Sequence, residues 1–176
     1  GQPVEVWRAT FDVGGQYWHE HTSATTDPAG EFVVDSLPQG TYNIRVGGAA
    51  GYIAEFWEDA FVSQPDHGTT FSLAPGDVWE NTIALEKGAK ISGTVKDTAG
   101  KALQYVTATA YLADQDGFYQ PFASATTGSK GTYTIDGLPE GDYKVGFRSS
   151  DAAPVKHVDR YWSAAATLDE AGSLWL

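Results

Sequence analysis

The chain has 176 residues, of which 41% are hydrophobic and 13% aromatic, and 11 basic against 23 acidic residues give it a formal net charge of −12. This apolar content is typical of a globular protein, and the acidic balance argues against binding to nucleic acid or anionic membranes, which requires a basic surface. The absence of cysteine excludes disulfides, thiolate metal sites and a cysteine nucleophile, and no stretch has the roughly 18 apolar residues that membrane insertion requires.

Short stretches of alternating apolar and polar residues follow one another along the chain. In the first half, the alternation predicts strands over residues 4–11, 17–25, 31–34, 42–46 and 77–85. In the second half, it predicts strands over residues 90–96, 105–112, 118–126, 132–135 and 143–147. No stretch has helical periodicity beyond about one turn, and the candidate region at residues 163–172 is alanine-rich but short. The fold class is therefore predicted to be all-β.

Two proline-containing turns divide neighbouring strands. Residues 35–40 read DSLPQG and residues 136–141 read DGLPEG. Proline presets the φ angle of the first turn corner, and glycine supplies the positive φ that closes the turn. We expect each turn to connect the two strands of a β-hairpin.

These turns belong to a longer repeated segment. Residues 124–147 repeat residues 23–46 without a gap, at an offset of 101, and ten of the 24 positions are identical. The identical positions are turn formers or core candidates, which indicates that a unit of about one hundred residues is used twice. We predict two tandem antiparallel β-sandwich repeats, residues 1–86 and residues 87–176.

The two predicted repeats differ at their ends. The strand at residues 90–96 opens the second repeat and has no counterpart before Gly1, so the first repeat is expected to lack its opening strand. The strand at residues 77–85 closes the first repeat, and the second repeat is expected to lack this closing strand. Because the chain begins with glycine and contains no methionine, we interpret it as a fragment. The unmatched ends favour a piece of a longer array whose neighbours supply the missing strands, and simple truncation of a long chain is the alternative. Each end then has an open sheet edge, which is an aggregation or pairing liability unless it is covered.

Several motifs carry a resemblance to a known family. The sequence ISGTVKD at residues 91–97, then GKAL at residues 100–103 and LPEGDY at residues 138–143, resembles the carboxypeptidase regulatory-like domains. The resemblance implies a prealbumin-like or starch-binding-like sandwich that serves as an accessory module in secreted enzymes and bacterial surface proteins, and hence an extracellular or cell-surface location. The related Cna B-type domains form Lys-to-Asn isopeptide bonds, but this chain has Ser92 where the lysine is expected.

Two short motifs contain potential metal ligands. His19-Glu20-His21 places two imidazoles on one face of a strand, and Asp114-Gln115-Asp116-Gly117 has the first two oxygen ligands of a calcium loop. Each lacks the further ligands of a complete site, so we interpret them as surface histidines and a polar turn. No serine lies in a nucleophile elbow, and adjacent acidic residues on an extended chain point apart. We therefore expect no enzyme activity, no cofactor and no metal.

Aromatic residues are the one feature that favours recognition of a ligand. The chain has more Trp and Tyr than two small sandwiches need, and alternation along the strands leaves one ring of each neighbouring pair facing outward. The candidates for stacking on sugar rings are Trp18, Tyr119, Trp57 and Trp162. The alternative is that these rings cover the open ends of the sandwiches or fill the contact between repeats.

Two functions of different classes remain open. The first is a non-catalytic structural module, a stalk, spacer or filament segment of a larger extracellular or cell-surface protein, whose partners are neighbouring repeats or subunits. A connection of about four residues, 86–89, supports it, because so short a linker prevents free tumbling. The alternative is a carbohydrate-binding accessory module of a secreted polysaccharide-degrading enzyme. An adhesin that binds protein would have the same sequence features as the structural module.

Overall fold

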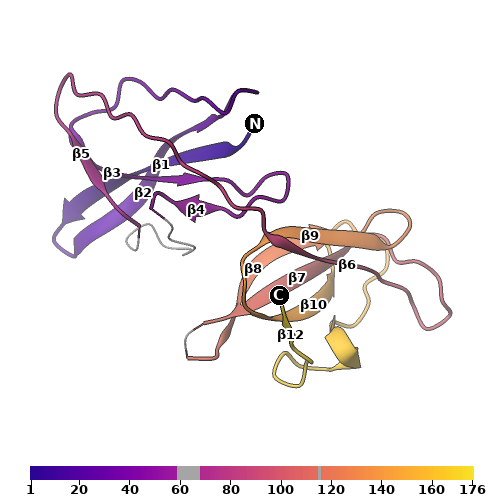
Figure 1. Ribbon diagram of the computed structural model, residues 1–176. Helices are drawn as coiled ribbons and strands as arrows, with labels where there is room; N and C mark the ends of the chain where they lie inside the picture. The colour runs from indigo at the N-terminus through magenta and orange to yellow at the C-terminus, as the bar shows by residue number, and fades with distance from the viewer. Residues whose placement is uncertain (59–67, 115) are drawn as a thin grey trace. The chain divides into compact units, whose positions relative to one another are not determined.

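A computed structural model describes residues 1–58, 68–114 and 116–176 of the chain. These residues form two compact units, Gly1–Lys87 and Gly88–Leu176 (Figure 1). Within the described ranges the regular structure consists of antiparallel strands and one 3₁₀ turn, and the predicted all-β class is confirmed. The described ranges contain no helix with the length and apolar character needed to cross a bilayer.

The first unit is built on one five-stranded sheet in the order β2-β1-β3-β4, in which β4 and β5 pair with opposite ends of β3. Its strands are β1 (Pro3–Asp12), β2 (Gly15–Thr25), β3 (Gly40–Val46), β4 (Glu55–Phe56) and β5 (Phe71–Leu73). Buried side chains of β1 and β3 form its core. Two extended segments, residues 31–37 and 79–85, pack apolar side chains against that core; these are Phe32, Val34, Leu37, Trp79, Ile83 and Leu85.

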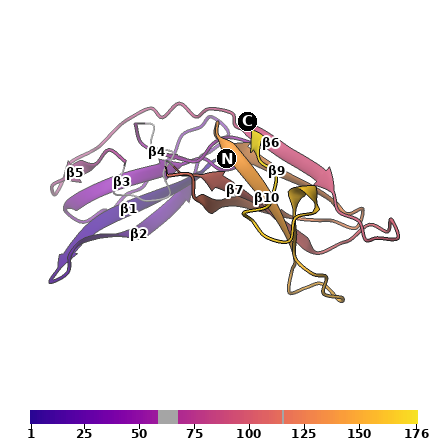
Figure 2. The ribbon, with the colours of Figure 1, turned by 90° about the horizontal axis from the view of Figure 1, so that it is seen from below.

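The second unit is a two-layered sandwich. One layer is a five-stranded sheet in the order β11-β10-β7-β8, with β12 also paired to β10, and the other layer is the pair β6-β9 (Figures 1 and 2). Its elements are β6 (Ala89–Thr94), β7 (Val106–Ala113), β8 (Tyr119–Thr126), β9 (Thr132–Leu138), β10 (Asp142–Ser149), β11 (Arg160–Tyr161), η2 (Trp162–Ala164) and β12 (Leu174–Trp175). The core lies between the layers and contains Ile91 and Ile135 from one and Ala108, Tyr143 and Val145 from the other.

The five-stranded sheets of the two units have corresponding strand orders. The order β2-β1-β3-β4 in the first unit corresponds, strand by strand, to the order β8-β7-β10-β11 in the second unit. In both hairpins the register shifts by one residue, and the unpaired residue is His21 in β2 and Phe122 in β8. Such a bulge bends a strand and increases its twist, so both sheets are shaped by the same local irregularity.

One tyrosine anchors the proline turn in each unit. Tyr42 and Tyr143 have no exposed surface, and their hydroxyls donate hydrogen bonds to the carbonyls of Pro38 and Pro139, respectively, over 3.0 Å in the second case. A buried phenol needs such an acceptor, because an unpaired hydroxyl in a core is costly. The backbone turn that precedes each tyrosine is thus held by the core itself.

The structure corrects two expectations from the sequence. Residues 31–34 and 77–85 are extended but belong to no strand, since no described residue pairs with them. The predicted hairpins at residues 35–40 and 136–141 are also wrong: in the second unit the turn passes from one layer to the other, because β9 pairs with β6 and β10 with β7. The alanine-rich region at residues 163–172 contains the end of the 3₁₀ turn Trp162–Ala164, the bridge residue Ala165 and a further turn at residues 168–170.

Burial of Tyr143 predicts a loss of stability at high pH. Desolvation raises the pKa of its phenol to about 12, above the ordinary value of about 10 that applies to the unfolded chain. Between pH 10 and 12, the folded state therefore holds a proton that the unfolded state has released. The contribution of Tyr143 to the free energy of unfolding is complete below pH 10 and is lost as the pH rises through 12. Over this range the free energy of unfolding should fall by up to about 1.4 kcal/mol per pH unit. Urea unfolding between pH 9 and 12 should show this slope, and Tyr143→Phe should remove it.

Candidate functional site

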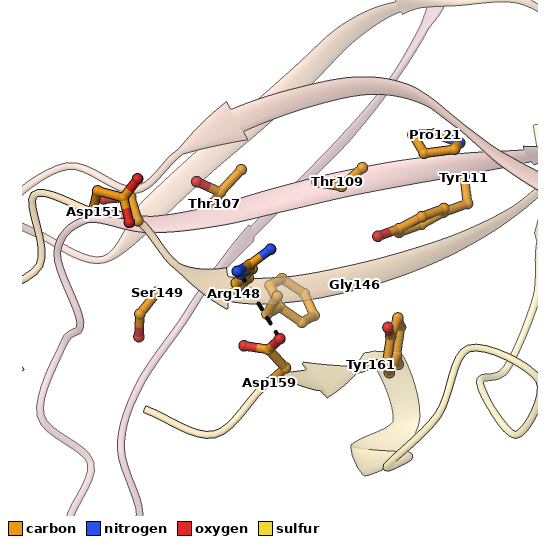
Figure 3. A pocket seen from close by; sticks show the side chains of 12 residues that line it. Thr107, Thr109, Tyr111, Pro121, Gly146, Arg148, Ser149, Asp151, Asp159 and Tyr161 are labelled. Atoms are coloured by element: carbon orange, nitrogen blue, oxygen red, sulfur yellow. Dashed lines mark ion pairs between the residues drawn. The ribbon is translucent and has the colours of Figure 1, made fainter. Parts of the chain in front are cut away.

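The outer face of the five-stranded sheet of the second unit is hollowed. The hollow has a volume of about 550 Å³ and is formed by β7, β10 and the segment that leads from β10 to β11 (Figure 3). Outward-facing side chains of β7 form its floor, because the residues between them, Ala108 and Ala110, point into the core. The side chains used below are Thr107, Thr109, Tyr111, Arg148, Asp159 and Tyr161.

Two tyrosine rings stand on either side of Gly146. The centroids of Tyr111 and Tyr161 are 6.4 Å apart, with 54° between the ring planes. A Cβ atom at Gly146 would lie 2.9 Å from the Tyr161 ring and 3.1 Å from the Tyr111 ring. Only glycine therefore lets both rings approach the strand at this point.

The polar groups of the hollow are charged or hydroxylic. Arg148 and Asp159 form an exposed ion pair, with 4.0 Å between Nε and Oδ2, which contributes little to stability in solvent. Burial, followed by the charges of Tyr161 and Asp159, raises the pKa of the Tyr111 phenol, although Arg148 opposes the shift. The Tyr111 hydroxyl is therefore a neutral hydrogen-bond donor at physiological pH. Together with Thr107 and Thr109, it gives the hollow donors and acceptors beside two flat rings.

The corresponding surface of the first unit is filled by side chains. In β3 the residue in the place of Gly146 is Arg45, flanked by Glu5 and Phe56 as Gly146 is flanked by Thr109 and Tyr161. Arg45 Nη1 lies 3.1 Å from Glu5 Oε1, and Trp7 Nε1 donates to the same carboxylate over 3.2 Å. An ion pair thus occupies the space that is open in the second unit.

The four predicted sugar-stacking residues lie outside the hollow. Trp18 is half-buried in β2, and Trp57 packs edge-on against Trp79, with 5.1 Å between centroids. Trp162 is 47% exposed in η2. Tyr119 begins β8, where its hydroxyl donates to Asp142 Oδ2 over 2.7 Å, a bond that raises the pKa of the phenol. Among the described residues, no ring contact joins any two of the four.

Sequence reasoning missed Tyr111 and chose Trp162 rather than its neighbour Tyr161. The alternation VTATAYL in residues 106–112 already places Tyr111 on the face opposite the buried alanines, so this signal was available. No sequence pattern predicts the open space beside Gly146, because this space depends on which residues of β7 and β11 lie next to that glycine.

The two motifs with potential metal ligands make local contacts instead. His19 Nδ1 lies 3.0 Å from the Thr10 hydroxyl, and the His21 ring packs edge-on against Tyr42. The Asp114 carboxylate accepts the backbone N–H groups of Asp116 and Phe118, over 3.0 and 2.8 Å, and so holds its own turn between β7 and β8. Residue 115 lies outside the described residues. No group of three or more potential metal ligands occurs in the described ranges.

Comparison with known proteins identifies one family. Neither the curated proteins nor the solved structures gave a significant match to the chain. Residues 90–169 match the model of the carboxypeptidase regulatory-like domain, which is a regulatory-like and not a catalytic domain. Residues 90–169 of the second unit, which include every residue that lines the candidate hollow, are therefore similar to the carboxypeptidase regulatory-like domain family.

Proposed function

We propose that the chain is a non-catalytic structural module, a stalk, spacer or filament segment of a larger extracellular or cell-surface protein. In this proposal the two units are tandem copies of one carboxypeptidase regulatory-like domain, and their partners are neighbouring units or subunits of the same protein. The extracellular location is supported by the resemblance of the sequence motifs and by a composition without cysteine or methionine, the residues most sensitive to oxidation.

The observation that carries the proposal is the correspondence of the two units. Both have the same strand order, a bulge at the same place and a buried tyrosine bonded to the proline turn. These features belong to the scaffold, whereas the hollow is open in one unit and filled in the other. A scaffold common to both units, with surfaces that differ, is what a repeated structural element requires.

The connection between the units also supports a spacer. Lys87 belongs to the first unit, where it pairs with Tyr52 through an isolated bridge, and Gly88 already belongs to the second. A Cβ atom at Gly88 would lie 2.5 Å from the backbone of β9, so this residue packs tightly on the second unit. No segment of linker composition separates the units.

Single-molecule force spectroscopy tests the structural role. A chain held at its two ends should unfold in two separate cooperative steps, each releasing about 300 Å, because the first unit spans Gly1–Lys87 and an extended residue spans about 3.5 Å. Two force peaks of this length are the expected result. Extension without a resolved peak would contradict a role in transmitting force.

The second candidate function is carbohydrate binding at the hollow of the second unit. It is favoured by one observation: two tyrosine rings and several hydroxyl groups face the same open space of about 550 Å³. Flat aromatic faces stack on the apolar faces of sugar rings, and neighbouring polar groups then orient the sugar hydroxyls. Because the protein is strongly acidic, a neutral polysaccharide is the expected ligand.

Titration with soluble neutral polysaccharides separates the two functions. Carbohydrate binding predicts a saturable change in Trp fluorescence, and Tyr161→Ala should weaken it at least about tenfold, since buried aromatic anchors carry most of the binding energy at such sites. Gly146→Arg should also weaken binding, because it introduces into the hollow the side chain that Arg45 has at the corresponding position of the first unit. Tyr17→Ala removes a ring that is 49% exposed in the first unit and is the matched control. No saturable change with starch, dextran or xylan would remove this candidate.

A further inference from the structure

The hollow of the second unit extends along β7 and β10, and its two ends differ. Outward-facing residues that lie opposite each other form successive rows across these strands: Thr107 with Arg148, Thr109 with Gly146, and Tyr111 with Lys144. Thr107 lies toward one end of the hollow and Tyr111 toward the other, as Figure 3 shows. The three rows therefore define a direction along the hollow.

The end of the hollow at the first row is open to solvent. The Arg148 side chain is 82% exposed, and that of its ion-pair partner Asp159 is 56% exposed. Asp151, which follows β10 and lies at this end in Figure 3, has a fully exposed side chain. A ligand bound in the hollow can therefore extend past this end.

The end of the hollow at the third row is covered. Lys144 faces outward from β10, as Gly146 does, yet it is only 9% exposed. Its Nζ donates to the carbonyl of Asp169 over 3.1 Å and lies 4.4 Å from the centroid of the Tyr119 ring. Residues 165–173, here called the covering segment, thus lie over the sheet where the hollow would otherwise continue.

The covering segment is fixed to the rest of the second unit at both of its ends. The backbone N–H of Tyr161 donates to the carbonyl of Ala165 over 3.0 Å, and that of Gly172 donates to the Ser163 hydroxyl over 3.2 Å. A Cβ atom at Gly172 would lie 3.0 Å from the Trp162 ring, so the segment packs closely on η2. The wall at this end of the hollow is therefore part of the folded unit.

We infer that the hollow binds the end of a neutral polysaccharide chain and not an internal stretch of it. This inference rests on the carbohydrate-binding function proposed above and specifies the ligand of that site. An internal stretch needs a groove that is open at both ends. A terminal sugar between the rings of Tyr111 and Tyr161 would instead meet the covering segment, and the remaining sugars would extend toward Arg148 and Asp151.

The size of the hollow agrees with a terminal ligand. Its volume of about 550 Å³ lies within the range of about 300–1,000 Å³ that is typical of sites for small ligands. Such a site holds a short piece of a chain, and the two rings at its closed end supply the flat surfaces on which a sugar stacks. The rest of the chain would stay in solvent.

Chain length separates the two modes of binding. At equal mass concentration, a linear polysaccharide that is about tenfold shorter has about tenfold more ends but the same number of internal stretches. Binding to ends therefore predicts half-saturation at an about tenfold lower mass concentration of the short form, by mass action. The probes are amylose and xylan, each in a long and a short form, and the readout is the change in Trp fluorescence.

The outcomes distinguish this inference from the function on which it rests. Saturation by the long and short forms at equal mass concentrations would overturn the inference and leave carbohydrate binding in place. No saturation with any of the four probes would overturn both. Because this comparison uses the unaltered chain, it does not depend on the folding of a variant.

A substitution at Tyr161 tests whether the chain ends bind in the hollow. Tyr161→Ala removes one of the two rings at the closed end, and it should raise the half-saturating concentration of the short form at least about tenfold. Tyr17→Ala is the matched control in the first unit and should leave this concentration unchanged. Binding of chain ends that is unaltered in Tyr161→Ala would overturn the inference, because the ends would then bind elsewhere.

Discussion

Replacement of Tyr143 by alanine is expected to destabilise the second unit by about 3–5 kcal/mol, the usual cost of removing a large buried aromatic side chain. The side chain has no exposed surface and contacts the core formed by both layers. Its loss leaves a cavity and also removes the hydrogen bond to the Pro139 carbonyl at 3.0 Å. Because domains of this size are stable by only about 5–15 kcal/mol, the variant unit should be close to unfolding.

Hydrogen exchange in increasing urea measures this loss unit by unit. Tyr143→Phe keeps the ring and removes only the hydroxyl, so it should cost about 1 kcal/mol. Tyr42→Ala is the corresponding change in the first unit and should destabilise that unit by a similar amount, since Tyr42 is also fully buried. A cost of less than about 1.5 kcal/mol for Tyr143→Ala would show that the ring does not hold the two layers together.

The second large effect is expected at Gly131. This glycine has a φ of +71°, which costs an alanine about 1–2 kcal/mol, and the new Cβ would also lie 2.6 Å from the Val95 carbonyl oxygen. Because backbone atoms on both sides cannot yield easily, overpacking adds about 1–3 kcal/mol. We therefore expect Gly131→Ala to cost about 3 kcal/mol in urea unfolding of the second unit.

Gly30→Ala is the matched control for this clash. Gly30 has a similar φ of +89°, but no described atom lies within 4 Å of its Cβ position, so only the conformational cost of about 1–2 kcal/mol remains. The difference between the two variants measures how closely β6 and its continuation pack on the second unit. Equal losses for both glycines would mean that Gly30 is as crowded as Gly131 and would contradict the expected clash at Gly131.

The hollow illustrates how corresponding units diverge at their surface. Arg45 in the first unit and Gly146 in the second have the same place on the third strand of the sheet. The ion pair of Arg45 with Glu5 lies where the second unit has an open space between Tyr111 and Tyr161. This difference alters the chemistry of the surface.

Most strands of the two five-stranded sheets could be predicted from the sequence. Residues 105–112, for example, alternate apolar and polar side chains and form β7 almost as predicted. The same alternation is present in residues 31–34 and 77–85, yet these form no strand, because a strand requires a partner as well as a pattern. The very short strands β4, β5, β11 and β12 were not predicted, since two or three residues are too few to show a period.

The sequence by itself determined the all-β class, the inward face of each long strand and the positions of the turns, because alternation and the φ preferences of proline and glycine act over a few residues. Only the tertiary structure decided that β9 and β10 belong to different layers, that Tyr111 and Tyr161 meet above Gly146, and that residues 31–37 pair with no strand among the described residues. Those features depend on register and on contacts between residues distant in the chain, and a local pattern carries no information about either.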